Sequence, residues 1–143
     1  MTSPATRPVA STEHLLRTVP ALADSSARDL RRMAALMDVV TLEPGAVLTT
    51  EGAFETQVFL LVEGSVAVSV GGDLVAVLGA GDVVGELGVL DRRLPRTATV
   101  TAMTPLTACV MTPRGLDSLL RGFPQAAALV ERAVAEHTEP LAG

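Results

Sequence analysis

Apolar residues recur at helical spacing near both ends of the chain. Residues 13–37 carry this pattern, with a turn near Pro20 and a helix start signal at Asp24-Ser25-Ser26. After Pro113 the helical spacing returns and is broken at Gly122-Phe123-Pro124. The pattern therefore predicts two helices before the central part of the chain and two helices after it.

Between these helices the period shortens to brief apolar or alternating runs. Turn residues separate the runs every seven to twelve positions, and Gly71-Gly72-Asp73 is the strongest hairpin signal. Alternating β-branched residues with frequent turns indicate an antiparallel sandwich or barrel, not a parallel sheet with crossover helices. We expect a small β-barrel or jelly roll with helices at its two ends. The predicted strand runs are DVVTL, AVLTTE, QVFLLVEG, SVAVSV, LVAVLG, RTATVTAM and LTACVMT.

The length of the chain predicts one domain. Of its 143 residues 48% are hydrophobic, which is enough to bury a core. We expect a flexible N-terminal tail over residues 1–12, the domain over 13–138 and a C-terminal tail over 139–143. The start of the chain lacks the apolar core of a signal peptide, and no apolar run approaches about 18 residues. Cys109, in an apolar run, is typical of a small buried hydrophobe, and we expect a cytoplasmic protein.

Charge and aromatic content exclude several classes of ligand. The net charge is −5, from 16 acidic and 11 basic residues, so the chain lacks the basic balance of a general nucleic-acid binder. Its aromatic residues, Phe54, Phe59 and Phe123, are too few to stack bases. His14 and His137 are too far apart to supply the clustered ligands of a metal site. We therefore expect a binding protein without a metal and not an enzyme.

One stretch, GELGVLDRRLPRTATV, interrupts the strand pattern and carries the chemistry. Gly85 and Gly88 allow the backbone N–H groups of a short helical turn to point inward and form an anion site. The guanidinium of Arg96 suits a phosphate. The carboxylate of Glu86, ten residues earlier, would repel a phosphate and needs a donor such as a ribose hydroxyl. Together these features predict a site for a sugar phosphate.

The same residues resemble a known motif. GDVVGELGVLDRRLPRTATV, residues 81–100, resembles the phosphate-binding cassette of cyclic nucleotide-binding domains, as in the catabolite activator protein family and the regulatory subunits of cAMP-dependent protein kinase. The resemblance extends to EPGAVLTTEG, VFLLVEGSVAV and LVAVLGAGD, and covers residues 13–138. It implies a mainly β fold, an eight-stranded antiparallel jelly roll of the cupin-like double-stranded β-helix type with terminal helices. It also implies a 3′,5′-cyclic nucleotide as ligand, with cAMP favoured and cGMP as the second candidate.

The resemblance assigns roles to individual residues. Glu86 would hold the ribose 2′-hydroxyl and Arg96 the cyclic phosphate, with nearby backbone amides assisting. Val75 and Val84 would be apolar walls around the ligand, although both also suit an ordinary barrel core. The implied ligand-binding residues are Val75, Val84, Gly85, Glu86, Leu87, Gly88, Arg96, Thr97 and Ala98.

Plainer structural roles stay open for several residues of this stretch. Glu86 also suits the cap of its own short helix, or an ion pair with Arg96. Arg92 and Arg93 suit an exposed loop tip as well as the attraction of a phosphate. The hydroxyl of Thr97 either supports the strand turn or contacts the amino group of a guanine, which keeps cGMP beside cAMP.

The end of the sequence shapes the expected mode of action. The chain ends at AEHTEPLAG, early in the helix that leads to a DNA-binding domain in bacterial regulators of this type. We therefore expect a stand-alone sensor that moves its terminal helices and signals to a separate effector protein. We expect a monomer or weak homodimer, with neither nucleic acid nor membrane as partner. His137 suits an exposed helix surface or a lid over the base. The alternative function is a protein-interaction module of the same fold that binds no nucleotide.

Overall fold

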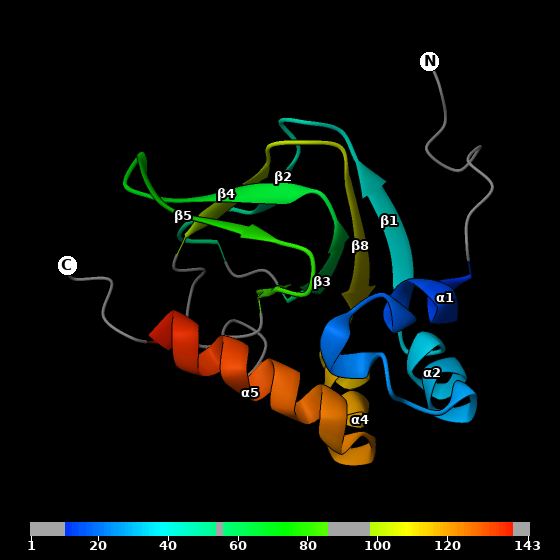
Figure 1. Cartoon of the computed structure of the whole chain (residues 1–143). Coiled ribbons are helices and arrows are strands. Elements are labelled where there is room, and N and C mark those ends of the chain that lie inside the picture. The colour runs from blue at the N-terminus through cyan, green and yellow to red at the C-terminus, as the bar shows by residue number, and fades with distance from the viewer. Residues whose placement is uncertain (1–10, 54–55, 86–97, 139–143) are drawn as a thin grey trace.

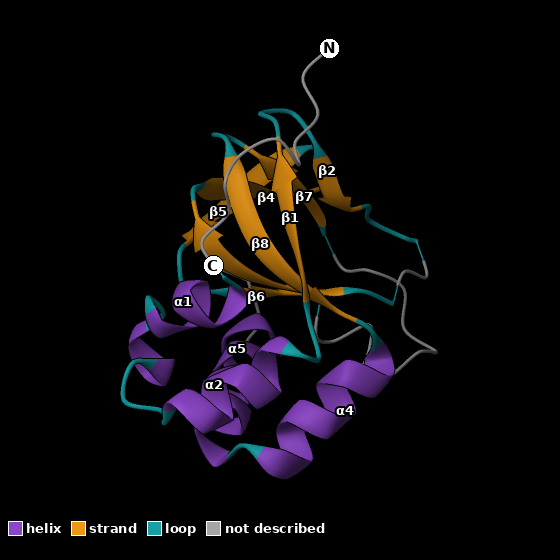
Figure 2. Ribbon diagram, turned by 90° about the vertical axis from the view of Figure 1, so that its right-hand side faces the viewer, coloured by secondary structure: helices purple, strands orange, loops and turns teal. Residues whose placement is uncertain are grey.

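The computed structural model describes residues 11–53, 56–85 and 98–138. In this part of the chain, strands form two four-stranded sheets, and the helices gather at one end of the sandwich (Figure 1, Figure 2). None of the described helices is long and apolar enough to cross a membrane. The elements are α1 (Thr12–Arg17), η2 (Pro20–Leu22), α2 (Ala27–Ala34), β1 (Asp38–Leu42), β2 (Val47–Thr49), β3 (Val58–Glu63), β4 (Ser65–Val70), β5 (Asp73–Gly79), β6 (Val83–Val84), β7 (Thr99–Ala102), β8 (Leu106–Met111), α4 (Pro113–Gly122) and α5 (Pro124–Thr138).

The strand order identifies the sandwich as a jelly roll. One sheet has the order β1-β8-β3-β6 and the other β2-β7-β4-β5, and all paired strands are antiparallel. Every connection between consecutive strands passes from one sheet to the other, except the β4–β5 hairpin. This alternation is that of a double-sheet jelly roll and confirms the predicted fold class.

The glycines of the turn explain the β4–β5 hairpin. The short length of β6 explains why the sequence pattern did not predict this strand. Gly71 and Gly72 have φ angles of 58° and 86° between the paired residues Val70 and Asp73, as a type I′ turn requires. The predicted hairpin is therefore confirmed. The sequence pattern did not indicate β6, because its two residues are too few to show alternation.

Two hydrophobic clusters fill the molecule, and β3 contributes to both. Phe59 and Leu61 point into the cluster between the two sheets. Leu60 points into the cluster beneath the helices, here called the helix-side cluster. Burial on both faces explains the unbroken apolar run VFLLV. Cys109 of β8 is fully buried in the helix-side cluster, as predicted, and this burial raises the pKa of its thiol to about 11. The thiol is therefore protonated at neutral pH and is not a candidate nucleophile.

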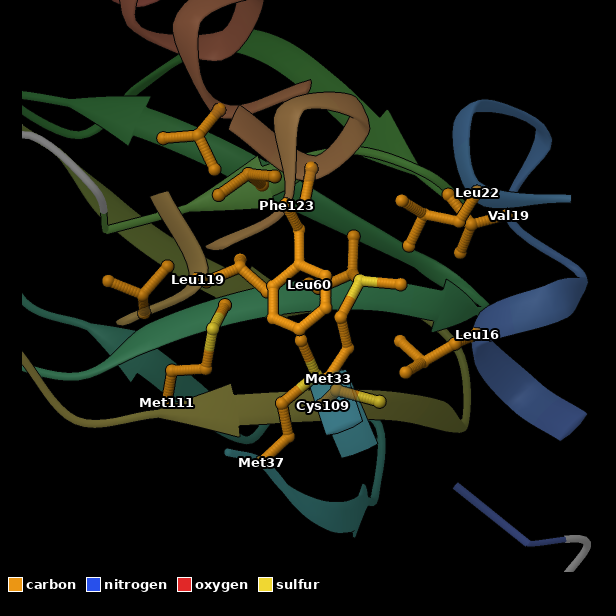
Figure 3. Packing of buried hydrophobic residues seen from close by; sticks show 14 of the residues in the cluster. Leu16, Val19, Leu22, Met33, Met37, Leu60, Cys109, Met111, Leu119 and Phe123 are labelled. Atoms are coloured by element: carbon orange, nitrogen blue, oxygen red, sulfur yellow. The ribbon is translucent and has the colours of Figure 1, made fainter. Parts of the chain in front are cut away.

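Phe123 joins the helices to the sandwich. It lies between α4 and α5 at the predicted break, where its backbone angles (φ −138°, ψ 94°) end α4. Its ring points toward Leu60 of β3 in the centre of the helix-side cluster (Figure 3). The guanidinium of Arg32 in α2 lies 5.5 Å from the centre of that ring. Gln125 Nε2 of α5 also donates to Ser25 Oγ at 3.0 Å, so α5 is tied to the N-terminal helices.

Candidate functional site

The candidate site lies on the connection between β6 and β7. The structure describes both ends of this connection, and residues 86–97 between them, here called the connecting segment, lie outside the described residues. β6 is an edge strand of one sheet, whereas β7 is an inner strand of the other sheet. The two ends of the connecting segment therefore lie in different sheets. We call them the entry anchor, at β6 and Gly85, and the exit anchor, at Ala98 and the start of β7.

The entry anchor is the short strand β6, which lies between the two cores. Val83 pairs with Leu60 and belongs to the helix-side cluster, whereas Val84 pairs with Phe59 and belongs to the cluster between the sheets. Both valines are almost fully buried. Gly85 follows with a φ of 92°, a left-handed conformation that a side chain would strain. The chain thus leaves the sandwich at a fixed position and with a glycine-dependent direction.

A tight turn before β6 fixes the entry further. The Oδ2 atom of Asp82 accepts a hydrogen bond from the backbone N–H of Gly79 at 2.8 Å. The carbonyl of Asp82 accepts from the N–H of Leu61 at 2.9 Å, and the N–H of Gly81 donates to the carbonyl of Leu61 at 2.7 Å. Asp82 was not singled out from the sequence. Its position directly after Gly-Ala-Gly was the available signal, since aspartate often hydrogen-bonds to the backbone of its own turn.

The exit anchor is held by two polar residues, one at the end of β2 and one in the loop that follows this strand. The buried hydroxyl of Thr49 donates to the carbonyl of Ala98 at 3.1 Å. The N–H of Glu51 donates to Thr99 Oγ1 at 3.0 Å, and its carboxylate accepts from the N–H of Gly71 at 2.9 Å. Glu51 therefore connects the start of β7 to the β4–β5 hairpin. The sequence pattern carried no signal for this contact, because the partners are far apart along the chain.

Replacing Glu51 with alanine should lower the free energy of unfolding by about 1 kcal/mol, because the N–H of Gly71 loses its carboxylate acceptor. Urea denaturation followed by circular dichroism measures the change. Glu51→Gln is the matched control, because its side-chain carbonyl can still accept the hydrogen bond. Equal losses in the two variants would contradict the role assigned to the acceptor oxygen.

The predicted ligand residues divide between described and undescribed parts of the chain. Val84 and Gly85 lie at the entry anchor and Ala98 at the exit anchor, so the structure places them at the two ends of the same connection. The predicted helical turn and the remaining positions lie outside the described residues. These positions are Glu86, Leu87, Gly88, Arg96 and Thr97, together with the loop residues Arg92 and Arg93.

Val75 is not a core residue, although the apolar run that contains it predicted one. It is 39% exposed on the edge strand β5. Val68 pairs with Ala76 and Ser69 pairs with Leu74, so Val75 is the extra residue of a β-bulge. The expectation of an ordinary core residue is therefore wrong for Val75 and right for Val84, which is 3% exposed. A role of either side chain as a ligand wall stays a prediction.

α5 connects the entry anchor to the helical end of the molecule. This helix packs against β6 and against η2. Val83 of β6 shares the helix-side cluster with Ala126 and Val130 of α5 and with Phe123, which directly precedes this helix. A displacement of β6 would therefore change the packing of α5 directly. The side chain of His137 near the end of this helix lies outside the described residues.

The composition of the described part limits the chemistry available. Among the described residues, no group of three histidine, cysteine, aspartate or glutamate side chains is placed to hold a metal ion. The anchors present backbone groups, hydroxyls, apolar side chains and the carboxylates of Asp82 and Glu51, and both carboxylates accept hydrogen bonds from backbone N–H groups. This arrangement fixes the two ends of the connecting segment, and the role of that segment in recognition stays a prediction.

A family model for the cyclic nucleotide-binding domain matches residues 39–122, more than half of the chain. The chain belongs to the cyclic nucleotide-binding domain family. The domain is 35% identical over 107 residues to a cAMP-dependent protein kinase regulatory subunit of Yarrowia lipolytica, and the match covers 73% of this chain and 28% of that protein. The chain spans less than a third of each of the curated relatives that it matches.

Solved structures agree with this assignment. The N-terminal domain of a transcriptional regulator from Streptomyces coelicolor A3(2) is 30% identical, with a TM-score of 0.63 over 86% of this chain and 91% of that one. The catabolite activator protein of Thermus thermophilus shares the fold, with 20% identity and a TM-score of 0.68 over 82% of this chain and 57% of that one. The family and fold predicted from the cassette motif of this cyclic nucleotide-binding domain are thereby confirmed. Its individual ligand residues stay predictions.

Proposed function

We propose that this domain binds a 3′,5′-cyclic nucleotide on the connecting segment, with cAMP favoured and cGMP as the second candidate. The observation that carries the proposal is that the chain belongs to this family and that its sequence has a glutamate, Glu86, and an arginine, Arg96, where the resemblance to the cassette expects the ribose and phosphate contacts. Glu86 would accept a hydrogen bond from the ribose 2′-hydroxyl, and Arg96 would bind the cyclic phosphate. The name of the Yarrowia relative, a cAMP-dependent kinase subunit, supports cAMP as the ligand.

We further propose that residues 13–138 act as one sensor unit that signals through its terminal helices. Binding would draw the connecting segment toward the phosphate and shift β6, whose Val83 lies in the cluster that holds α5. The ligand shifts this equilibrium only by its different affinity for the two arrangements of the helices. The output would pass to a separate effector protein, with neither nucleic acid nor a membrane as partner. The domain would bind and regulate without catalysing a reaction.

Thermal melting with added nucleotide tests the proposal. A ligand at about 100 times its dissociation constant adds about 2.7 kcal/mol to the free energy of unfolding. For a chain of this size we expect cAMP or cGMP to raise the melting temperature by about 5–10 °C. The matched control is 5′-AMP, which keeps the base and ribose but lacks the cyclic phosphate ester, and should give no shift.

Two outcomes would contradict the proposal. The absence of a shift with both cyclic nucleotides at millimolar concentration would favour the alternative function, an interaction module of the same fold that binds no nucleotide. An equal shift with 5′-AMP would show that the site does not select the cyclic phosphate. A calorimetric titration with cAMP and with cGMP then decides which base is preferred.

A further inference from the structure

The outer side of the sheet β2-β7-β4-β5 has an unusual composition. Val66 of β4 packs between the sheets, so its neighbour Ala67 points to the other side of the sheet. The strand register aligns Ala67 with Thr101 and Val77, and Thr101 with Val47. These side chains form one row across all four strands, on the side that faces away from the core.

Large apolar side chains on this surface are exposed to solvent. Val47 is 56% exposed and Val77 54%, at opposite edges of the sheet. Met103 is 50% exposed beyond the end of β7, and Leu74 is 64% exposed on β5. Within the paired strands the other described positions on this side are alanine, glycine, serine and threonine, and none of these is charged. Glu51, beyond the end of β2, lies beside Thr99 at the edge of this side. We call this surface, with Val47, Ala67, Leu74, Val77, Thr101 and Met103, the outer face.

An uncharged outer face departs from the usual pattern. The solvent side of an antiparallel sheet normally alternates polar residues with buried apolar ones, and charged side chains discourage association. Among the described residues, the charged side chains near the ends of these strands are acidic, namely Glu43, Glu51, Glu63 and Asp73, all exposed. The described sandwich residues, 38–53, 56–85 and 98–111, contain no lysine or arginine. The outer face is thus an uncharged surface with acidic residues at its border.

We propose that the outer face binds the outer face of a second copy of this chain and forms a weak symmetric dimer. A face without charges can pack against itself without burying an unpaired charge, and a two-fold interface needs only such self-complementarity. Flat sheets stack face to face at a separation of about 10 Å. The helices gather at one end of the sandwich (Figure 2), and α5 packs against β6 of the other sheet and against η2, so the proposed interface does not use these contacts of α5.

The size of the face predicts the strength of the dimer. The four strands have 3, 4, 6 and 7 residues, and with a spacing of about 4.8 Å and a rise of about 3.3 Å per residue they cover about 300 Å² in each copy. Two copies would bury about 600 Å², about half of the 1,200 Å² at which stable specific interfaces begin. The dimer should therefore form at high micromolar to millimolar protein concentration.

The acidic border predicts an unusual dependence on salt. When two copies meet, the borders bring like charges together, and this repulsion opposes association. The screening length falls from about 30 Å at 0.01 M salt to about 3 Å at 1 M. Dimerisation should therefore strengthen as the salt concentration rises. An interface in which the acidic sandwich of one copy meets the arginine-bearing helices of another would weaken instead.

Sedimentation equilibrium of the whole chain tests the proposal. In 1 M NaCl the average mass should rise with protein concentration from 14.8 kDa toward twice that value, and in 20 mM NaCl it should stay near 14.8 kDa. Val77→Glu and Val47→Glu, at opposite edges of the face, should each weaken the dimer at least tenfold. Ala21→Glu adds the same charge at an exposed position of η2 and should leave the dimer unchanged.

Each alternative result is distinguishable from the expected one. A monomer under all conditions would overturn the proposal and leave the face for a different protein. A dimer that weakens with salt, or one that Ala21→Glu disrupts as strongly as Val77→Glu, would place the interface elsewhere. Because Val47 and Val77 are already more than half exposed, the variants should fold, and circular dichroism verifies this. The result does not depend on nucleotide binding.

Discussion

Replacing Arg96 with alanine should lower the affinity for the cyclic nucleotide at least about thirtyfold. Truncating one partner of a desolvated, hydrogen-bonded charge pair costs about 2–5 kcal/mol of binding free energy. Each 1.4 kcal/mol corresponds to about a tenfold change in the dissociation constant. A guanidinium that donates two parallel hydrogen bonds to a phosphate is such a partner. The loss of affinity is measured by calorimetric titration with the nucleotide, cAMP or cGMP, that raises the melting temperature.

The chain offers matched controls for this variant in Arg92 and Arg93. They carry the same side chain within a few residues of Arg96, and we predict that each alanine variant binds within about threefold of the original chain, an affinity difference below about 1 kcal/mol. The melting temperature of nucleotide-free Arg96→Ala should match that of the original protein. Retained affinity in Arg96→Ala would move the phosphate to another part of the connecting segment. Loss of affinity in all three variants would indicate attraction by net charge instead of a specific contact.

Replacing Phe123 with alanine should lower the free energy of unfolding by about 3–5 kcal/mol, the usual cost of truncating a buried phenylalanine. The ring is 4% exposed and lies where α4, α5 and α2 meet β3 (Figure 3). Domains of this kind have about 5–15 kcal/mol of stability in total, so the loss would be a large share. Urea denaturation measures it, and the two helices on either side of Phe123 should become more susceptible to proteolysis.

Two further substitutions separate packing from the cation–π contact at this position. Phe123→Met keeps most of the buried volume and should cost less than about 1.5 kcal/mol. Arg32→Met removes the guanidinium 5.5 Å from the ring centre and should cost about 1 kcal/mol or less. If Arg32→Met proved as destabilising as Phe123→Ala, the cation and not the ring would hold the junction.

Local features of the structure were predictable from the sequence because they depend on neighbouring residues. The helices at both ends follow from apolar spacing, from the start signal at Asp24-Ser25-Ser26, whose Ser26 caps α2, and from the break at Gly122-Phe123-Pro124. The β4–β5 hairpin follows from Gly71-Gly72, since both positions need a positive φ. The burial of Cys109 follows from its apolar run. In each case a few adjacent residues determine the backbone geometry.

The anchors of the candidate site were not predictable, because their partners are remote in sequence. Thr49 and Ala98 are 49 positions apart, and Glu51 and Gly71 are 20 apart. The exposure of Val75 was also missed, because a bulge in the register shifts it out of the alternating pattern. β6 is defined only by its pairing with β3, and its two residues have no pattern of their own.

The sequence by itself therefore determined the fold class, the flanking helices and the cassette motif that places this chain in the cyclic nucleotide-binding domain family. Those properties are carried by periodicity, turn residues and a contiguous run of residues. Only the tertiary structure decided that the two ends of the connecting segment lie in different sheets, that α5 packs on the entry strand β6, and that the outer face combines exposed apolar residues without charge. These features arise when strands far apart in the chain pair in one register, and no local pattern specifies that register.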